Sequence, residues 1–331
     1  MWSPLLRVER HDDVTRLVFA SRPGRALGYT VSAYVVAPRA GSAERRPVLV
    51  DTGFPRARHA LVLALVRLAR ERRADGGAWA SGPPDPATVA TRREGRGPAG
   101  ALDAEAFATG LRELLAGAVV THAHEDHAGN AALLQRMGVP LAMGDATRAL
   151  LAARERVGLY RRVVWGTMTP LDPRRQPPFD PAPLALVPAP GHSPDHHVAW
   201  DAERETVFGG DLFIGVRVRI AHLWEDPRAH VRALRAVAAL RPRRYFDAHR
   251  GPVDAPVAAL EAKAAWMEDR VADVERLLDR GWPARRVRAA VFGREELTGL
   301  VSCGAYSRTN FVRAVRRTRA GAAPPLGTAA S

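Results

Sequence analysis

A short polar segment, VVTHAHEDHAGN at residues 119–130, places three histidines and an aspartate within six positions, directly after an apolar run. Alternate residues of an extended segment share a side, so His122 and His124 can face one ion. Once the chain turns, Asp126 and His127 can face a second ion beside the first. Imidazole and carboxylate groups suit zinc, and also iron or manganese. The segment therefore predicts part of a metal site.

Four donors cannot complete two metal sites, and three further candidates stand at the ends of other predicted strands. The run LALVPAPGHS places His192 after a glycine that permits a tight turn. TVFGGD ends in Asp211, a carboxylate able to bridge two cations, and YFDAHRG places His249 after another short strand. Because functional side chains collect where strands end, these junctions favour a dinuclear centre.

The elements that position these residues alternate between strands and helices along the chain. Strands are expected at residues 16–20, 29–37, 47–53, 118–121, 139–143, 183–189, 196–200, 206–210 and 214–218. Helices are expected at residues 57–72, 103–116, 131–137 and 145–157, with Asn130 as the N-cap of the third. This alternation predicts an α/β protein with sheets in the middle.

A long amphipathic helix is predicted near the C-terminus. Its apolar residues follow one another at alternating spacings of three and four: Val257, Leu260, Ala264, Met267, Val271, Val274 and Leu278. Such spacing forms one stripe on a helix, and the helix should end at residues 281–283, Gly-Trp-Pro. Met267 is therefore expected in the core.

The predicted domain organisation has three parts. Residues 1–252 form a catalytic domain, residues 253–320 a helical C-terminal region, and residues 321–331 a frayed tail rich in alanine, glycine and proline. Within the first part, residues 74–100 are rich in glycine and proline and show no periodicity. They are predicted as a disordered insertion in a surface loop.

Length and composition limit the class of protein. The chain has 331 residues, of which 47% are hydrophobic, enough for a substantial core. Cys303 is the only cysteine, which excludes a disulfide framework and a thiolate zinc site. The first residues carry no long apolar run, and no apolar stretch approaches transmembrane length. We therefore expect a soluble, cytoplasmic protein without a membrane partner.

The net charge of +14 is a property shared with many nucleic-acid-binding proteins. However, Lys263 is the only lysine among 49 basic residues, and alanine, glycine and proline are abundant, a pattern typical of codon bias in a GC-rich genome. The arginines are also scattered, which favours solvated surface charge. A small-molecule substrate is therefore expected rather than nucleic acid, and a homodimer is left open.

With these residues in view, the sequence resembles the metallo-β-lactamase superfamily. Its motifs stand here in the family's order as Asp51-Thr-Gly53, Thr121–Gly129, Gly191–Pro194, Gly209–Asp211 and His249. The resemblance covers about residues 48–251. It implies a four-layer αββα sandwich with a dinuclear site at one edge, followed here by a helical C-terminal extension.

The resemblance also implies a ligand set and a pair of divalent ions, with zinc expected first and iron or manganese as alternatives. One metal would take His122, His124 and His192, the other would take Asp126, His127 and His249, and Asp211 would bridge them. Two such cations lower the pKa of a shared water from about 15.7 to about 7 and so supply a bridging hydroxide. Asp126 can orient that hydroxide or take its proton. A metal-dependent hydrolase is expected, in agreement with the absence of a GxSxG sequence.

Two residues are expected to support the ligands. Asp51 would brace the loops under the site, with a structural turn as the alternative; an aspartic protease would need a second DTG copy. His196 would hydrogen-bond a ligand, with ordinary polar surface as the alternative. The remaining histidines without partners at metal spacing are expected to be surface or helix residues: His11, His59, His222 and His230.

Three functions remain for such a protein. The first is hydrolysis of a small ester or thioester, such as an acyl-CoA or a glutathione thioester. Glyoxalase II (hydroxyacylglutathione hydrolase) is an enzyme of this kind, and residues 253–320 resemble its helical addition. The second is hydrolysis of a phosphodiester, as in tRNA 3′-processing enzymes or β-CASP nucleases. The positive charge favours this function, but the sequence shows no β-CASP insertion. The third is a non-enzymatic regulatory or nucleic-acid-binding member, against which the complete ligand set argues. We predict the thioesterase.

Overall fold

The computed structural model describes residues 3–320, except 27, 43, 75–110, 154–157 and 176–178. The chain forms two compact units. Unit 1 comprises Met1–Met143, Leu151–Ala153 and Val163–Ala182, and unit 2 comprises Gly144–Leu150, Arg154–Arg162 and Pro183–Ser331. The predicted insertion at 74–100 (apart from Ala74) and the predicted tail at 321–331 lie outside the described residues. So does most of the helix predicted at 103–116, of which residues 111–114 are described and helical.

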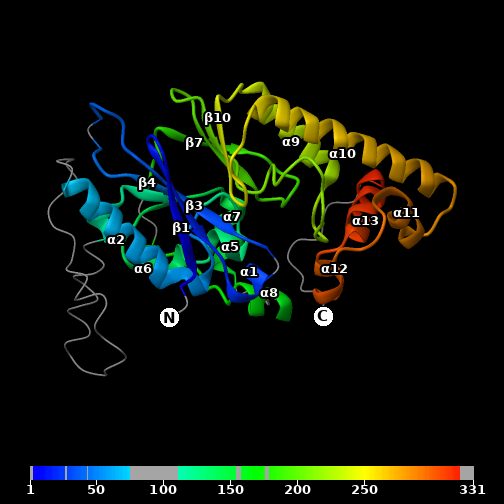
Figure 1. The fold of residues 1–331 in the computed structure, drawn as a ribbon, viewed down its shortest axis with the longest axis horizontal. Coiled ribbons are helices and arrows are strands. Elements are labelled where there is room, and N and C mark those ends of the chain that lie inside the picture. The colour runs from blue at the N-terminus through cyan, green and yellow to red at the C-terminus, as the bar shows by residue number, and fades with distance from the viewer. Residues whose placement is uncertain are drawn as a thin grey trace. The chain divides into compact units, whose positions relative to one another are not determined.

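Unit 1 is built on a six-stranded sheet whose strands lie in sequence order, and Figure 1 labels β1, β3 and β4 of this sheet. The strands are β1 (Leu5–His11), β2 (Val14–Phe19), β3 (Val31–Val36), β4 (Val48–Val50), β5 (Gly117–Val119) and β6 (Leu141–Ala142). The first four pair antiparallel, and β4, β5 and β6 pair parallel. Every residue of β3 is buried, as expected of a central strand.

The helices of unit 1 include those that carry part of the predicted site. They are α1 (Arg22–Ala26), the 3-10 helix η1 (Pro55–Ala57), α2 (Arg58–Ala74), α5 (Glu125–Ala128) and α6 (Ala131–Arg136). Two further short helices contain residues of both units: α7 (Asp145–Ala152) and α8 (Leu159–Val164). Along α2 the buried side chains include Leu61 and Leu65, four positions apart on one face.

Unit 2 is built on a five-stranded sheet in the order β11-β10-β9-β8-β7. Its strands are β7 (Leu184–Pro188), β8 (His197–Asp201), β9 (Thr206–Phe208), β10 (Arg244–Asp247) and β11 (Gly251–Pro252). Only β9 and β10 pair parallel. The helices are α9 (Pro227–Ala239), α10 (Pro256–Asp279), α11 (Ala284–Phe292), α12 (Leu297–Val301) and α13 (Arg308–Arg319).

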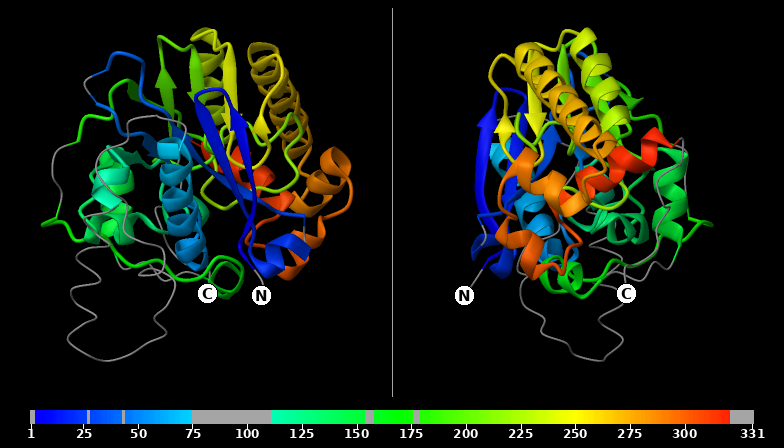
Figure 2. Two further views of the ribbon diagram at one scale, coloured as in Figure 1. Left: turned by 60° about the vertical axis from the view of Figure 1, so that its left-hand side comes forward. Right: turned by 90° about the vertical axis from the view of Figure 1, so that its right-hand side faces the viewer.

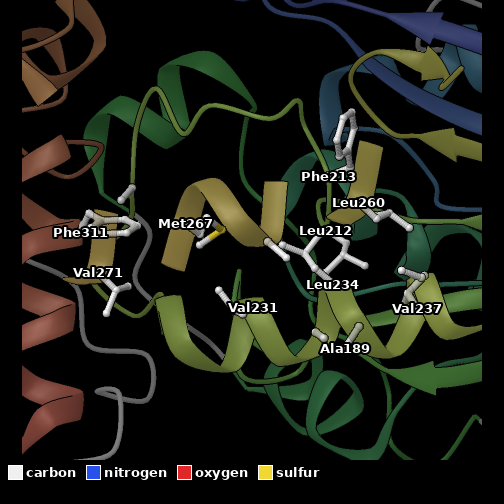
Figure 3. Close-up of a cluster of buried hydrophobic side chains, with 14 of the residues drawn as sticks. Ala189, Leu212, Phe213, Val231, Leu234, Val237, Leu260, Met267, Val271 and Phe311 are labelled. Atoms are coloured by element: carbon white, nitrogen blue, oxygen red, sulfur yellow. The ribbon is translucent and has the colours of Figure 1, made fainter. Parts of the chain in front are cut away.

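The core of unit 2 lies around the two long helices, α9 and α10, which run side by side (Figure 2). Figure 3 shows Leu212, Leu234, Leu260 and Met267 in the cluster between them. The predicted stripe is confirmed, because its residues on α10 are buried or packed against this cluster. The core position of Met267, which is 1% exposed, is also confirmed.

The predicted α/β class with a helical C-terminal region is confirmed, since both sheets carry helices and α11–α13 follow α10. The predicted domain boundary after residue 252 stays a prediction. None of the helices in the described part of the chain has the length and apolar character needed to cross a membrane.

Two local predictions were wrong. Residues 214–218, all of them described, form no strand, because Ile214 has a φ of +44°, which breaks the extended backbone. Asn130 makes no side-chain cap bond to α6. Its amide nitrogen instead donates to the carbonyl oxygens of Thr52 at 2.7 Å and Phe54 at 3.0 Å, tying α6 to the segment after β4.

Candidate metal centre

Unit 1 contributes a first pair of imidazoles from the segment between β5 and α5. His122 is fully buried, and His124, with extended backbone, immediately precedes α5. His122 Nε2 lies 2.9 Å from His124 Nδ1. Two nitrogens bound to one tetrahedral zinc stand about 3.3 Å apart, given Zn–N bonds of about 2.0–2.1 Å. The two ring nitrogens therefore converge as a pair of metal ligands would.

The second pair of donors in unit 1 stands on α5 itself. Asp126 is 5% exposed and His127 is fully buried. Asp126 Oδ2 lies 3.8 Å from His127 Nε2. The two donors are consecutive residues of one short helix, which brings a carboxylate oxygen and an imidazole nitrogen to one place without a long loop.

Asp51 lies behind His127 in the same unit. It follows β4 with a φ of +59°, an uncommon conformation for a residue with a side chain. Its Oδ2 is 2.8 Å from His127 Nδ1, and its Oδ1 accepts from the Thr121 backbone N–H at 2.9 Å. Because a carboxylate accepts, His127 carries its proton on Nδ1 and presents the Nε2 lone pair to a metal.

Replacing Asp51 with asparagine should therefore weaken metal binding by about 10–100-fold, since an amide can donate to His127 Nδ1 and move the proton to Nε2. Competition with a colorimetric chelator measures the affinity. Ser32→Ala is the control. It removes another buried hydrogen bond of unit 1, which Arg16 Nε donates to the Ser32 hydroxyl, and it leaves every candidate metal ligand in place. Equal affinities in Asp51→Asn and wild type would show that the tautomer does not depend on Asp51.

Unit 2 contributes three donors, one after each of three strands. His192 follows Gly191, whose φ is +143° and where an added Cβ would lie 2.2 Å from the His230 Cα, so only glycine fits. Asp211 follows β9, and His249 follows β10. These three side chains meet within the unit, although they are far apart in the sequence.

The carboxylate of Asp211 faces two imidazoles at once. Its Oδ2 lies 3.3 Å from His192 Nε2, and its Oδ1 lies 3.0 Å from His249 Nε2. Asp211 is 3% exposed, so solvent does not compete for either oxygen. A carboxylate that presents one oxygen to each of two imidazoles has the geometry of a bridge between two cations.

Buried polar groups surround these three donors. His196 Nε2 accepts from the Asp211 backbone N–H at 3.0 Å. Glu225 Oε1 lies 3.7 Å from His192 Nδ1, and burial raises the pKa of Glu225 to about 8. Asp247 Oδ1 accepts from the His249 backbone N–H at 2.8 Å, and burial also raises the pKa of Asp247.

The prediction that His222 is a surface or helix residue was wrong, because it is buried outside any helix, whereas His230 lies on a helix, α9, as predicted, with its side chain buried. His230 Nε2 lies 2.7 Å from the Leu212 carbonyl oxygen. The His222 ring packs against the Trp224 ring at an interplanar angle of 35°, with 3.4 Å between ring centroids. Burial lowers the pKa of both, that of His222 to about 2, so both rings are neutral. His59 is exposed, as predicted.

The expected site residues thus fall into two sets. Unit 1 brings together His122, His124, Asp126, His127 and Asp51, and unit 2 brings together His192, Asp211, His249 and His196. Imidazole nitrogens and carboxylate oxygens, buried or partly buried and supported by further hydrogen bonds, fit a divalent metal ion. The sequence reasoning missed Glu225, Asp247 and the polar role of His230; only His230 gave a signal, since it shares the core face of α9 with Leu234 and Val237.

Comparisons with known proteins agree with this chemistry. Residues 115–263 match the family model described as Metallo-beta-lactamase superfamily, and this segment contains all seven expected ligands. No curated protein matches the chain.

The chain is also similar to solved structures. A metallo-beta-lactamase family protein from Thermus thermophilus superposes with a TM-score of 0.55 at 19% identity, over 88% of this chain and 89% of that one. The metallo-beta-lactamase FIM-1 from Pseudomonas aeruginosa gives 0.49 at 18% identity, over 80% and 96%. A metallo-beta-lactamase from Pontibacter korlensis gives 0.49 at 17% identity, over 80% and 99%. The match to the family model over residues 115–263 confirms the resemblance seen in the sequence.

Proposed function

We propose that this protein is a dinuclear-metal hydrolase that cleaves a small ester or thioester. The family and the histidine and aspartate donors support a metal-dependent hydrolase. The observation that carries the dinuclear form is Asp211, whose two oxygens each face a different imidazole. A single ion would leave one of those oxygen–imidazole pairs without a role.

The proposed cofactor is a pair of divalent ions, zinc first and iron or manganese as alternatives. As the family resemblance implies, one ion would take His122, His124 and His192, the other would take Asp126, His127 and His249, and Asp211 would bridge them. The donor types support this assignment, since imidazole and carboxylate ligands suit all three metals.

The chain's own residues have separate tasks in the reaction. When bound, the ions supply Lewis-acid chemistry: they acidify water and polarise the carbonyl oxygen of the substrate. Asp126 orients the attacking water and takes its proton. Asp51 holds the ring of His127 through its hydrogen bond to Nδ1, and the burial of Asp51, Asp126 and His127 excludes competing solvent.

The substrate class is supported by an aromatic cluster in unit 2. Tyr306, from the predicted C-terminal region, lies 5.7 Å from Tyr160 and 5.1 Å from His222 between ring centroids. The backbone N–H of His222 donates to Glu225 Oε1 at 3.0 Å, and the same oxygen lies near His192. The cluster thus adjoins the donors and can serve as an apolar wall for an acyl group. Arg161 lies 5.2 Å above the Trp224 ring and adds positive charge for an anionic leaving group such as coenzyme A or glutathione.

The test compares substrates on zinc- and manganese-loaded protein. Acyl-CoA and acyl-glutathione thioesters are assayed beside a generic phosphodiester, with His122→Ala as the blank and chelator-stripped protein as a second blank. We expect thioester turnover that disappears in both blanks and returns when metal is added to the stripped wild type.

The other outcomes separate the alternatives. Turnover of the phosphodiester alone would assign the chain to the nucleases of the superfamily and give the arginine-rich surface a role. Metal binding without turnover of any substrate would favour a regulatory role. Wild-type protein that retains no metal would overturn the proposal altogether.

A further inference from the structure

The loop that carries Asp211, residues 209–214, is held by side chains from several other elements. The Asp211 N–H donates to His196 Nε2 at 3.0 Å, beside β8. The Leu212 carbonyl oxygen is 2.7 Å from His230 Nε2 on α9. The Ile214 N–H donates to Asp247 Oδ2 on β10 at 2.6 Å. We call residues 209–214 the Asp211 loop. Its main chain is anchored from outside, which fixes where the carboxylate of Asp211 points.

One further anchor comes from α10. The ammonium group of Lys263 donates to the carbonyl oxygen of Phe213, two residues after Asp211. Lys263 is 3% exposed and lies on the buried face of α10 with Leu260 and Met267. A buried ammonium is costly unless it is hydrogen-bonded and paired with opposite charge, so an ordinary core position would carry an apolar residue here.

The surroundings of Lys263 supply that opposite charge. Burial lowers the pKa of its ammonium to about 8, while the carboxylates of Asp247, Glu225 and Asp211 act in the other direction. At neutral pH the group is therefore mostly charged and donates strongly. Its charge also offsets the negative charge of Asp211 and Asp247, two acidic side chains near the same ligands.

We propose that Lys263 is a positioning residue: by holding the Phe213 carbonyl, it fixes the Asp211 loop so that both oxygens of Asp211 can ligate metal. This inference rests on the proposed function, because it takes Asp211 as a metal ligand. It also gives α10 a task beyond packing, since the first helix of the predicted C-terminal region then sets the geometry of the metal centre.

The test replaces Lys263 in the full-length protein. Lys263→Met has similar volume but neither charge nor donor, and Lys263→Arg retains both. Val271→Ala is the matched control, because it weakens the same buried face of α10 at the end of the cluster opposite Phe213 (Figure 3). Affinity for zinc is measured by chelator competition, and the visible absorption of the cobalt(II)-loaded protein reports the ligand geometry.

We expect Lys263→Met to bind zinc about 10–100-fold more weakly than wild type and to show an altered cobalt spectrum. Lys263→Arg should recover part of both properties. Val271→Ala should melt at a lower temperature yet keep the wild-type affinity and spectrum. Wild-type affinity and spectrum in Lys263→Met would overturn the inference while leaving the proposed function intact.

A measurement on the wild type decides the matter even where a variant fails to fold. Because Lys263 is the only lysine, protein labelled with ζ-¹⁵N lysine gives one side-chain nitrogen resonance. This resonance should shift as zinc is added and stop shifting when the metal sites are full. A resonance that does not move while zinc binds would contradict the positioning role. Wild-type protein that binds neither zinc nor cobalt would overturn both the inference and the proposed function.

Discussion

Replacing Asp211 with asparagine should lower bound zinc from about two ions per chain to one or none, and should reduce thioester hydrolysis at least about 10²–10³-fold. The carboxylate oxygens lie 3.3 Å from His192 Nε2 and 3.0 Å from His249 Nε2. Asparagine keeps the volume and one acceptor oxygen. It places an uncharged amide nitrogen against the other imidazole, so it cannot bridge two cations. Metal content after dialysis and steady-state kinetics measure the two effects.

Asp201→Asn is the matched control for this substitution. Asp201 is also fully buried in unit 2, where it accepts from the Arg204 backbone N–H at 3.1 Å, and it is the last residue of β8. The control should keep the wild-type metal content and turnover, even where it lowers the melting temperature. Two ions and full activity in Asp211→Asn would show that Asp211 is not the bridge, and a matching loss in Asp201→Asn would show that the effect is merely structural.

The strand-end positions of His192 and Asp211 could be predicted from the sequence, because each follows a short apolar run and a turn glycine. The structure has β7 and β9 shortly before them. The apolar stripe of α10 could also be predicted, since helical periodicity over many residues leaves little ambiguity.

Other features depended on the tertiary structure. The strand predicted at 214–218 is β-branched in composition, yet the backbone turns at Ile214 because its N–H is bound by Asp247 from a distant strand. Conversely, β1 was not predicted, although its alternation of apolar and charged residues is typical of an edge strand. Local propensity does not include such long-range bonds.

The buried polar groups were the hardest to predict. Lys263 lies beside the apolar stripe of α10, three residues after Leu260. His230 lies on the core face of α9. In a sequence, such residues look like the charged edge of an amphipathic helix. Their role becomes visible only when the Leu212 and Phe213 carbonyl oxygens are seen beside them.

The second large effect is expected at Gly209, the first residue of the Asp211 loop. A Cβ added there would lie 1.8 Å from the Tyr245 Oη and 2.1 Å from its Cζ. Tyr245 is 1% exposed on β10, so the ring has no free space to move into and the backbone must shift instead. Gly209→Ala should therefore cost about 3 kcal/mol of unfolding free energy. Urea denaturation measures this cost.

Two control comparisons make the test specific to the contact between residue 209 and the Tyr245 ring. Gly158→Ala, where nothing lies within 4 Å of the added carbon, should change the unfolding free energy by less than about 1 kcal/mol. In a Tyr245→Leu background, which removes the tip of the ring, Gly209→Ala should cost clearly less than it does in the wild type. Equal costs in the two backgrounds would show that the strain arises elsewhere in the loop. Because Asp211 is only two residues away, the same backbone shift should also weaken zinc binding, and Tyr245→Leu should restore part of that binding along with the stability.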